Sequence, residues 1–154
     1  MPDYIEKGLD ITVITNGLPI TTRFADTGFT VYSIGGRLLK EALAYVGKPA
    51  EAAVASYNAD IMFFSVASIS EDGMLSDWSE DEAAIRVAMA KNAKRLVLMC
   101  DTTKINTVST FTLFPLSRVD YLICDKPLPS ELVKKFSMTQ ITSSPAYLYE
   151  IKEK

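Results

Sequence analysis

The chain contains no histidine. This absence excludes the Ser-His-Asp and Cys-His catalytic arrangements and every zinc site with an imidazole ligand. Only carboxylates, lysine, tyrosine and cysteine remain as acids and bases. Cysteine is scarce too, because Cys100 and Cys124 are the two in the chain, each near the end of an apolar run. We expect two buried, reduced thiols rather than a disulfide, since that is the usual state in a cytosolic protein.

Long apolar runs and runs of positive charge are also missing. The longest apolar stretches, such as Arg95–Cys100, fall far short of the roughly 20 residues that span a bilayer. Met1–Gly8 is polar and lacks the apolar centre of a signal peptide, so we expect a cytoplasmic protein with no membrane contact. The net charge is −3 and no basic cluster occurs. The chain alone should therefore not bind DNA or RNA.

The 154 residues, 48% of them hydrophobic, are enough for one core. No repeat, low-complexity tract or linker interrupts them, so we expect a single domain over residues 1–154. The predicted strands are Leu9–Ile14, Phe29–Ile34, Leu43–Val46, Ile61–Ser65, Arg95–Cys100, Val119–Cys124 and Tyr147–Ile151. Their apolar runs are continuous rather than alternating. This pattern predicts an α/β fold with a mostly parallel sheet and helices on both faces.

Four helices are predicted, and the pattern is strongest for Ser79–Lys94. Ser79 is a suitable N-cap, and Glu82 three residues later completes a capping-box pattern. Acidic residues fill the first turn and lysines fill the last, which suits the helix dipole. The other three predicted helices are Pro19–Phe24, Pro49–Asn58 and Ser130–Phe136.

Polar groups follow several predicted strands. Ligands of open parallel sheets bind beyond the carboxyl ends of the strands, so these groups should share one rim. Hydroxyls, an amide, backbone N–H groups and a lysine together suit a phosphorylated polyol. Glu82 lies on the inward stripe of its helix, where it can face the same pocket. The groups on the rim are Thr15 with Asn16, Gly35 with Gly36, Ser65, and Asp101 with Lys104.

Each of these groups also has a purely structural interpretation. The glycine pair can serve a tight turn that needs positive φ, and the Asp-Lys pair can be an exposed ion pair of little consequence. Glu82 can act only as a capping residue. Thr15-Asn16-Gly17 is a common turn, and Ser65 and Ser68 can simply satisfy backbone groups. No Walker loop, Rossmann fingerprint, CxxC pair or metal-ligand cluster is present, so we expect no cofactor and no metal.

Taken in order, these segments resemble the effector-binding domain of the DeoR family of bacterial transcriptional regulators. The resemblance runs from about Leu9 to Asp125. It is carried by Val13-Ile14-Thr15-Asn16, Gly35-Gly36, Gly47, Ala59-Asp60-Ile61-Met62-Phe63-Phe64-Ser65, Ser70-Glu71-Asp72-Gly73, Glu82-Ala83 with Met89, Asp101-Thr102-Thr103-Lys104 and Val119-Asp120-Tyr121-Leu122-Ile123. The order and spacing are more specific than any single motif.

The resemblance implies the fold of ribose-5-phosphate isomerase and CoA-transferase-like enzymes, a phosphorylated sugar as effector, and a homo-oligomer. It also implies that Lys104 contacts anionic or hydroxyl oxygens and that Glu82 accepts a hydrogen bond from a sugar hydroxyl. The residues implied to line the pocket are Thr15, Asn16, Gly35, Gly36, Ser65, Glu82, Asp101 and Lys104.

The sequence departs from the family pattern in three places. The family carries an N-terminal helix-turn-helix, which this sequence lacks, so operator DNA is expected to be bound only through a missing N-terminal domain. The family domain also opens with a strand and a phosphate-cradling loop. This sequence is expected to start later, with Met1–Lys7 as the tail of the following helix, and to bind phosphate less well. A serine also fills the family's glycine position near Ser65.

Three functions remain open from the sequence. The leading hypothesis is a ligand-sensing domain, in which effector binding shifts the population of oligomer arrangements and so changes DNA binding. An alternative is an aldose–ketose isomerase for sugar phosphates, which needs two carboxylates converging on one substrate carbon. Glu82 and Asp101 are its only candidates. The third is an assembly domain with a vestigial pocket.

Overall fold

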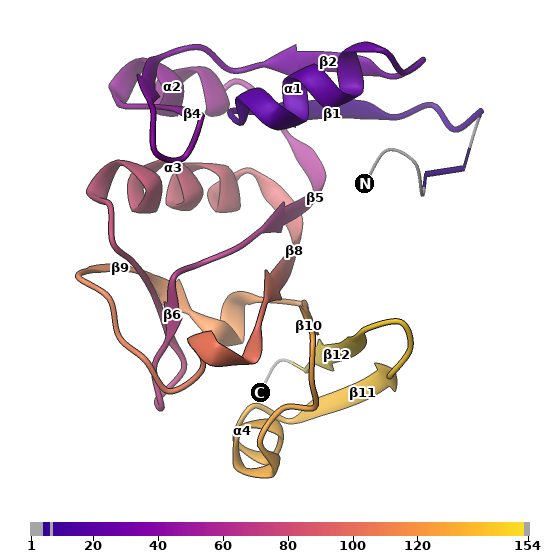
Figure 1. Ribbon diagram of the computed structural model, residues 1–154, viewed down its shortest axis with the longest axis vertical. Coiled ribbons are helices and arrows are strands. Elements are labelled where there is room, and N and C mark those ends of the chain that lie inside the picture. Colours follow the sequence, from indigo (N-terminus) through magenta and orange to yellow (C-terminus); the bar gives the residue numbers. More distant parts are fainter. Residues whose placement is uncertain (1–4, 7, 153–154) are drawn as a thin grey trace. The chain divides into compact units, whose positions relative to one another are not determined.

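The computed structural model describes residues 5–6 and 8–152 (Figure 1). The helix tail expected at Met1–Lys7 falls mainly outside these residues, because 1–4 and 7 are not described. The chain divides into two compact units, Met1–Tyr57 and Asn58–Lys154, called unit 1 and unit 2 below.

Unit 1 contains two small sheets and two helices. The strands β1 and β2 pair in parallel, with Thr12 opposite Thr30 and Thr15 opposite Ser33. The strands β3 and β4 form an antiparallel pair. The core of unit 1 contains Phe24, Ile34, Val46, Ala50 and Val54. The elements are β1 (Thr12–Thr15), α1 (Leu18–Ala25), β2 (Thr30–Ser33), β3 (Arg37–Leu39), β4 (Ala44–Val46) and α2 (Lys48–Val54).

Unit 2 is built on a five-stranded sheet in the order β11-β12-β10-β8-β5. The strands β5, β8 and β10 run parallel, as predicted. The strands β12 and β11 extend the sheet in antiparallel pairing. Its elements are β5 (Ala59–Phe64), β6 (Ser68–Ile69), β7 (Met74–Asp77), α3 (Glu80–Lys91), β8 (Ala93–Cys100), η2 (Thr102–Lys104), β9 (Phe111–Pro115), η3 (Leu116–Arg118), β10 (Tyr121–Cys124), α4 (Ser130–Lys135), β11 (Met138–Thr142) and β12 (Tyr147–Ile151).

A second sheet in unit 2 pairs β6 with β7 and β7 with β9, both antiparallel. The sequence prediction missed all three strands. β6 and β7 are short, and they carry Ser68, Ser76 and Asp77, polar residues that are buried here. Polar residues in a short segment are typical of a loop, so no apolar run marked these two strands.

The core of unit 2 lies around β8 and β10. Leu98 and Leu122 are fully buried, together with Leu75 and Leu116 from the second sheet region. Cys100 and Cys124 are free and buried, as expected from the sequence. Burial raises the pKa of the Cys100 thiol to about 12 and that of the Cys124 thiol to about 11. Both thiols are therefore protonated and unreactive at neutral pH.

The expectation that helices cover both faces of the sheet is wrong for β5. Met62 and Phe64 are buried, but Ile61 and Phe63 are 47% and 45% exposed. Helix α3 packs against β5 and β8. Among the described residues of unit 2, no helix buries the opposite face of β5. Although the sequence of β5 is continuously apolar, its side chains therefore alternate between buried and exposed positions along the strand.

Helix α3 begins where the sequence predicted and ends earlier. The Ser79 Oγ accepts a hydrogen bond from the Glu82 N–H at 3.4 Å, which confirms the N-cap. The helix ends at Lys91 instead of Lys94. Asn92 bonds its side-chain amide to the Ala88 carbonyl at 3.2 Å and closes the last turn. Lys94 is already part of β8. Within the described part of the chain, no helix is long and apolar enough to cross a membrane.

Candidate functional site

In unit 1, the ends of β1 and β2 lie side by side, as the predicted rim requires. The Thr15 carbonyl accepts a hydrogen bond from the Ile34 N–H at 2.8 Å. The Thr15 hydroxyl is buried and accepts from the Gly17 N–H at 3.1 Å. The Asn16 side-chain amide donates to the Tyr45 carbonyl at 2.9 Å. Both side chains therefore stabilise the turn itself, in line with the structural interpretation of this motif.

The two glycines that follow β2 differ in their surroundings. Gly36 has φ +154, and a Cβ placed there would lie 2.8 Å from the Val46 carbonyl oxygen. A Cβ at Gly35 would meet no atom within 4 Å. Glycine is thus required at position 36, because the Val46 backbone lies too close to leave room for a Cβ atom. Gly35 leaves open space beside the rim.

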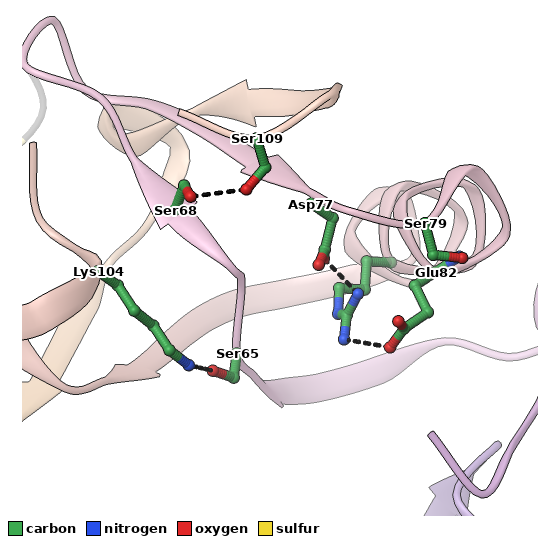
Figure 2. A network of polar contacts seen from close by, with 8 residues as sticks. Ser65, Ser68, Asp77, Ser79, Glu82, Lys104 and Ser109 are labelled. Atoms are coloured by element: carbon green, nitrogen blue, oxygen red, sulfur yellow. Dashed lines mark hydrogen bonds and ion pairs between the residues drawn. The ribbon is translucent and has the colours of Figure 1, made fainter. Parts of the chain in front are cut away.

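In unit 2, the carboxyl ends of β5, β8 and β10 bring predicted residues together. The Lys104 ammonium donates to the Ser65 hydroxyl at 3.1 Å (Figure 2). The Asp101 carboxylate lies 3.6 Å from the same ammonium. Asp125, at the end of β10, accepts from the Thr102 N–H at 2.8 Å. Ser65, Asp101 and Lys104 therefore form one group, as expected for residues that follow parallel strands.

The turn η2 sets the position of Lys104. Asp101 caps this turn by accepting from the Thr103 N–H at 3.1 Å. The Thr103 hydrogen bond and, to a smaller extent, the Lys104 charge keep the pKa of Asp101 below its usual value. Asp101 is thus ionised at neutral pH and is used mainly to shape the turn that carries the lysine.

Glu82 is held by a charged network that the sequence did not indicate. The Glu82 carboxylate accepts from the Arg86 guanidinium at 2.9 Å, and the other guanidinium nitrogen bonds Asp77. In Figure 2, Asp77 and Glu82 converge on one guanidinium from two sides. Asp77 is buried at the end of β7. Glu82 and Arg86 are one helical turn apart, a spacing that indicates an ion pair between them. The sequence prediction did not include β7, so it could not indicate that Asp77 joins this pair.

Asp77 connects this network to Lys104. Burial raises the pKa of Asp77, and the nearby positive charge of Arg86 opposes that rise. The charge of Lys104 also lowers the pKa of Asp77, so the ammonium lies within electrostatic reach of this carboxylate. This electrostatic interaction links the Ser65–Lys104 pair to the Asp77–Arg86–Glu82 network, both of which are drawn in Figure 2. We call the combined group the unit 2 cluster: Ser65, Asp77, Glu82, Arg86, Asp101 and Lys104.

A buried hydroxyl pair fixes the segment after Lys104. The hydroxyls of Ser68 and Ser109 lie 2.7 Å apart, and the Ser109 N–H donates to the Ser76 hydroxyl at 2.9 Å. The Thr107 N–H bonds the Ile69 carbonyl at 3.2 Å. Ser68 thus pairs with another side-chain hydroxyl, whereas the structural interpretation of the sequence had it satisfy a backbone group. These hydrogen bonds attach the segment to β6 and β7.

The charged side chains of the unit 2 cluster are paired with one another. The cluster contains two cations and three carboxylates, and each cation already contacts a carboxylate. The side chains of Lys104, Glu82 and Arg86 are 29%, 24% and 22% exposed, so a ligand can reach them. Within residues 5–6 and 8–152, no group of acidic residues or cysteines is placed to hold a metal ion.

Comparison with known proteins assigns the family. The model of the DeoR C-terminal sensor domain matches residues 1–126. The chain belongs to this family. The sensor domain is 34% identical over 120 residues to the uncharacterized HTH-type transcriptional regulator YgbI of Escherichia coli, a match that covers 77% of the chain and 47% of that protein. It is 31% identical over 126 residues to the HTH-type transcriptional repressor GlcR of Bacillus subtilis, covering 81% and 48%.

A third relative is the putative aga operon transcriptional repressor of Escherichia coli O157:H7, 27% identical over 128 residues and covering 82% of the chain and 48% of that protein. The chain spans about half the length of the curated relatives that it matches. The chain is thus a DeoR-type sensor domain, and these relatives are named as transcriptional regulators or repressors, in line with the expectation that the chain is not an enzyme. The isomerase alternative is accordingly set aside.

Proposed function

We propose that this sensor domain binds a phosphorylated sugar and that binding changes the affinity of a DeoR-type regulator for its operator. In this proposal the operator is contacted by a helix-turn-helix domain outside the chain, and copies of the sensor domain assemble into a homo-oligomer. The domain would share the fold of the ribose-5-phosphate isomerase and CoA-transferase-like proteins. The effector acts by binding one arrangement of the oligomer more tightly than another.

One observation carries the proposal: four sequence-predicted pocket residues of unit 2 occur in a single charged cluster. Lys104 contacts both Ser65 and Asp101, and Glu82 is linked to this lysine through Arg86 and the electrostatic interaction of Asp77 with Lys104. Carboxylates accept hydrogen bonds from sugar hydroxyls, and lysine donates to sugar or phosphate oxygens. Within unit 1, the rim with Thr15, Asn16 and the two glycines is also proposed to bind ligand.

The first experiment titrates the purified chain with a panel of sugar phosphates and records the melting temperature and the heat of binding. We expect at least one sugar phosphate to raise the melting temperature. A ligand present at 100 times its Kd stabilises the folded state by about 2.7 kcal/mol, which is several degrees for a chain of this size. If no sugar phosphate stabilises the chain or gives binding heat, the proposal is wrong.

Two variants locate the site. Lys104→Met removes the ammonium that contacts Ser65 and should weaken the effector at least about tenfold, since a hydrogen bond to a charged group contributes about 1.5–3 kcal/mol. Lys94→Met is the matched control. It removes a lysine of the same unit that is 77% exposed and paired with Asp60. Equal loss of affinity in the two variants would contradict the assignment of Lys104.

A mobility-shift assay tests the regulatory step in a longer regulator that contains this chain and a DNA-binding domain. The effector that stabilises the isolated chain should change operator affinity, and Lys104→Met should abolish that change while leaving effector-free DNA binding intact. Operator affinity that does not respond to a bound effector would contradict the regulatory part of the proposal.

A further inference from the structure

Asp77 is the most buried charged residue of the unit 2 cluster. The residue is only 5% exposed, and its carboxylate bonds the Arg86 guanidinium (Figure 2). A buried carboxylate is costly unless cations and hydrogen bonds stabilise it. The groups that face Asp77 are Arg86 and Glu82 from α3, Lys104 from η2 and the neighbouring backbone N–H of Trp78. Both cations of the cluster therefore act on this one carboxylate.

The same interactions act in reverse on the two cations. One guanidinium nitrogen of Arg86 bonds Asp77 and the other bonds Glu82. The Lys104 ammonium lies 3.6 Å from the Asp101 carboxylate and also interacts electrostatically with Asp77. Three carboxylates thus offset two cations. An incoming phosphate or sulfate at this position would meet a net negative charge in a partly buried environment, where Coulomb repulsion is strong.

We propose that Asp77 is a specificity-determining residue, whose buried carboxylate offsets Arg86 and Lys104 so that the unit 2 cluster accepts ligand hydroxyl groups and rejects anionic groups. This inference rests on the proposed function and narrows it. The unit 2 cluster holds the polyol end of the effector, and the phosphate group is bound elsewhere. Lys104 then donates to a hydroxyl oxygen rather than to phosphate.

The test uses inorganic sulfate, which keeps its double charge throughout the neutral range. Wild type and Asp77→Asn are titrated at low ionic strength, with chemical shifts or binding heat as the signal. Asn has the same shape as Asp but no charge, so Asp77→Asn should bind sulfate at least about tenfold more tightly than wild type. Asp60→Asn, which removes an 85% exposed carboxylate of the same unit, should behave as wild type.

A second variant identifies the site of the gained affinity. Adding Arg86→Gln and Lys104→Gln to Asp77→Asn should return sulfate binding to the wild-type level, because both cations that the first change uncovers are then gone. If Asp77→Asn does not fold, judged by its melting curve, the wild type itself supplies the measurement. Sulfate affinity should then rise as the pH is lowered and Asp77 is protonated, and the double variant with Arg86→Gln and Lys104→Gln should remove that rise.

Equal sulfate affinity in wild type and Asp77→Asn would overturn the inference, and so would equal gains in Asp77→Asn and Asp60→Asn. The outcome is independent of the sugar-phosphate titration, since sulfate alone is the probe. If no sugar phosphate binds, the proposed function is wrong. The sulfate comparison would still test whether Asp77 offsets the positive charges of Arg86 and Lys104.

Discussion

Two adjacent glycines in unit 1 have different structural requirements, and substitution separates them. Gly36→Ala would place a methyl group 2.8 Å from the Val46 carbonyl oxygen and 3.0 Å from the Ala50 Cβ, at φ +154. We expect a loss of about 1–3 kcal/mol in the free energy of unfolding, measured by urea denaturation, because both the backbone conformation and the contact are unfavourable.

Gly35→Ala is the matched control. Its new methyl group meets no atom within 4 Å, so the free energy of unfolding should stay within about 0.5 kcal/mol of wild type, as is usual for surface changes. A loss of equal size in both variants would contradict the close-approach explanation for Gly36. If instead Gly35→Ala leaves stability unchanged and weakens the effector, open space at this glycine is used by the ligand.

The properties of single residues also explain why only some members of the unit 2 cluster could be predicted from the sequence. Ser65 and Asp101 directly follow apolar strands, and Lys104 lies in the turn after Asp101, so the general rule for parallel sheets finds all three. Asp77 is the last residue of a strand that has no apolar run, and its partner Arg86 lies on a helix surface where charged residues are ordinary. Neither residue type nor spacing singles out a carboxylate that becomes important through burial.

At the scale of elements, helix α3 has the N-cap that the sequence predicts, but the other half of the predicted capping box does not form. Ser79 caps the helix, but the Glu82 side chain turns to Arg86 and leaves the capping box half made. Ser79→Ala should cost about 1 kcal/mol in the free energy of unfolding, because an N-terminal N–H loses its acceptor. Thermal or urea denaturation measures this loss.

Ser79→Asp keeps an acceptor at the N-cap and adds a favourable charge at the positive end of the helix, so it should retain most of the wild-type stability. Since Glu82 does not bond the Ser79 backbone, we expect Ser79→Ala to leave the Glu82–Arg86 contact in place. A stability loss in Ser79→Asp as large as in Ser79→Ala would show that Ser79 contributes through packing and not through capping.

At the scale of the whole molecule, the two units differ in how much structure each contains. Unit 2 holds a five-stranded sheet, a second sheet and the larger set of buried apolar side chains. Unit 1 holds two sheets of two strands each, which are marginal by themselves. We expect a fragment of residues 58–154 to fold and unfold cooperatively by circular dichroism, and a fragment of residues 1–57 to remain largely unfolded.

Measurement of both fragments in the same buffer checks this asymmetry. A folded 1–57 fragment, or a 58–154 fragment without a cooperative transition, would contradict it. If the expectation holds, sulfate titrations of unit 2 can be repeated on the shorter fragment, since Asp77, Arg86 and Lys104 all lie within it. The contribution of the unit 1 rim can then be measured by difference from the intact chain.

The sequence by itself determined the class of chemistry and much of the sheet. The absence of histidine, the continuous apolar runs and the polar residues after them are local properties, and they led to the parallel strands β5, β8 and β10, the N-cap at Ser79 and the contact group of Ser65, Asp101 and Lys104. These results depend on hydrophobic periodicity and on a general rule for strand ends, both of which can be read along a chain.

Only the tertiary structure decided which polar residues are buried and which charges meet. The pairing of β7 with β6 and β9 buries Asp77, Ser68 and Ser76. The packing of α3 brings Arg86 to Asp77, and η2 brings Lys104 within reach of the same carboxylate. Electrostatic energies depend on distance and burial, which are set by contacts between residues far apart in sequence. The charge balance of the cluster, and with it the inferred preference for hydroxyl groups, therefore emerges only from the folded chain.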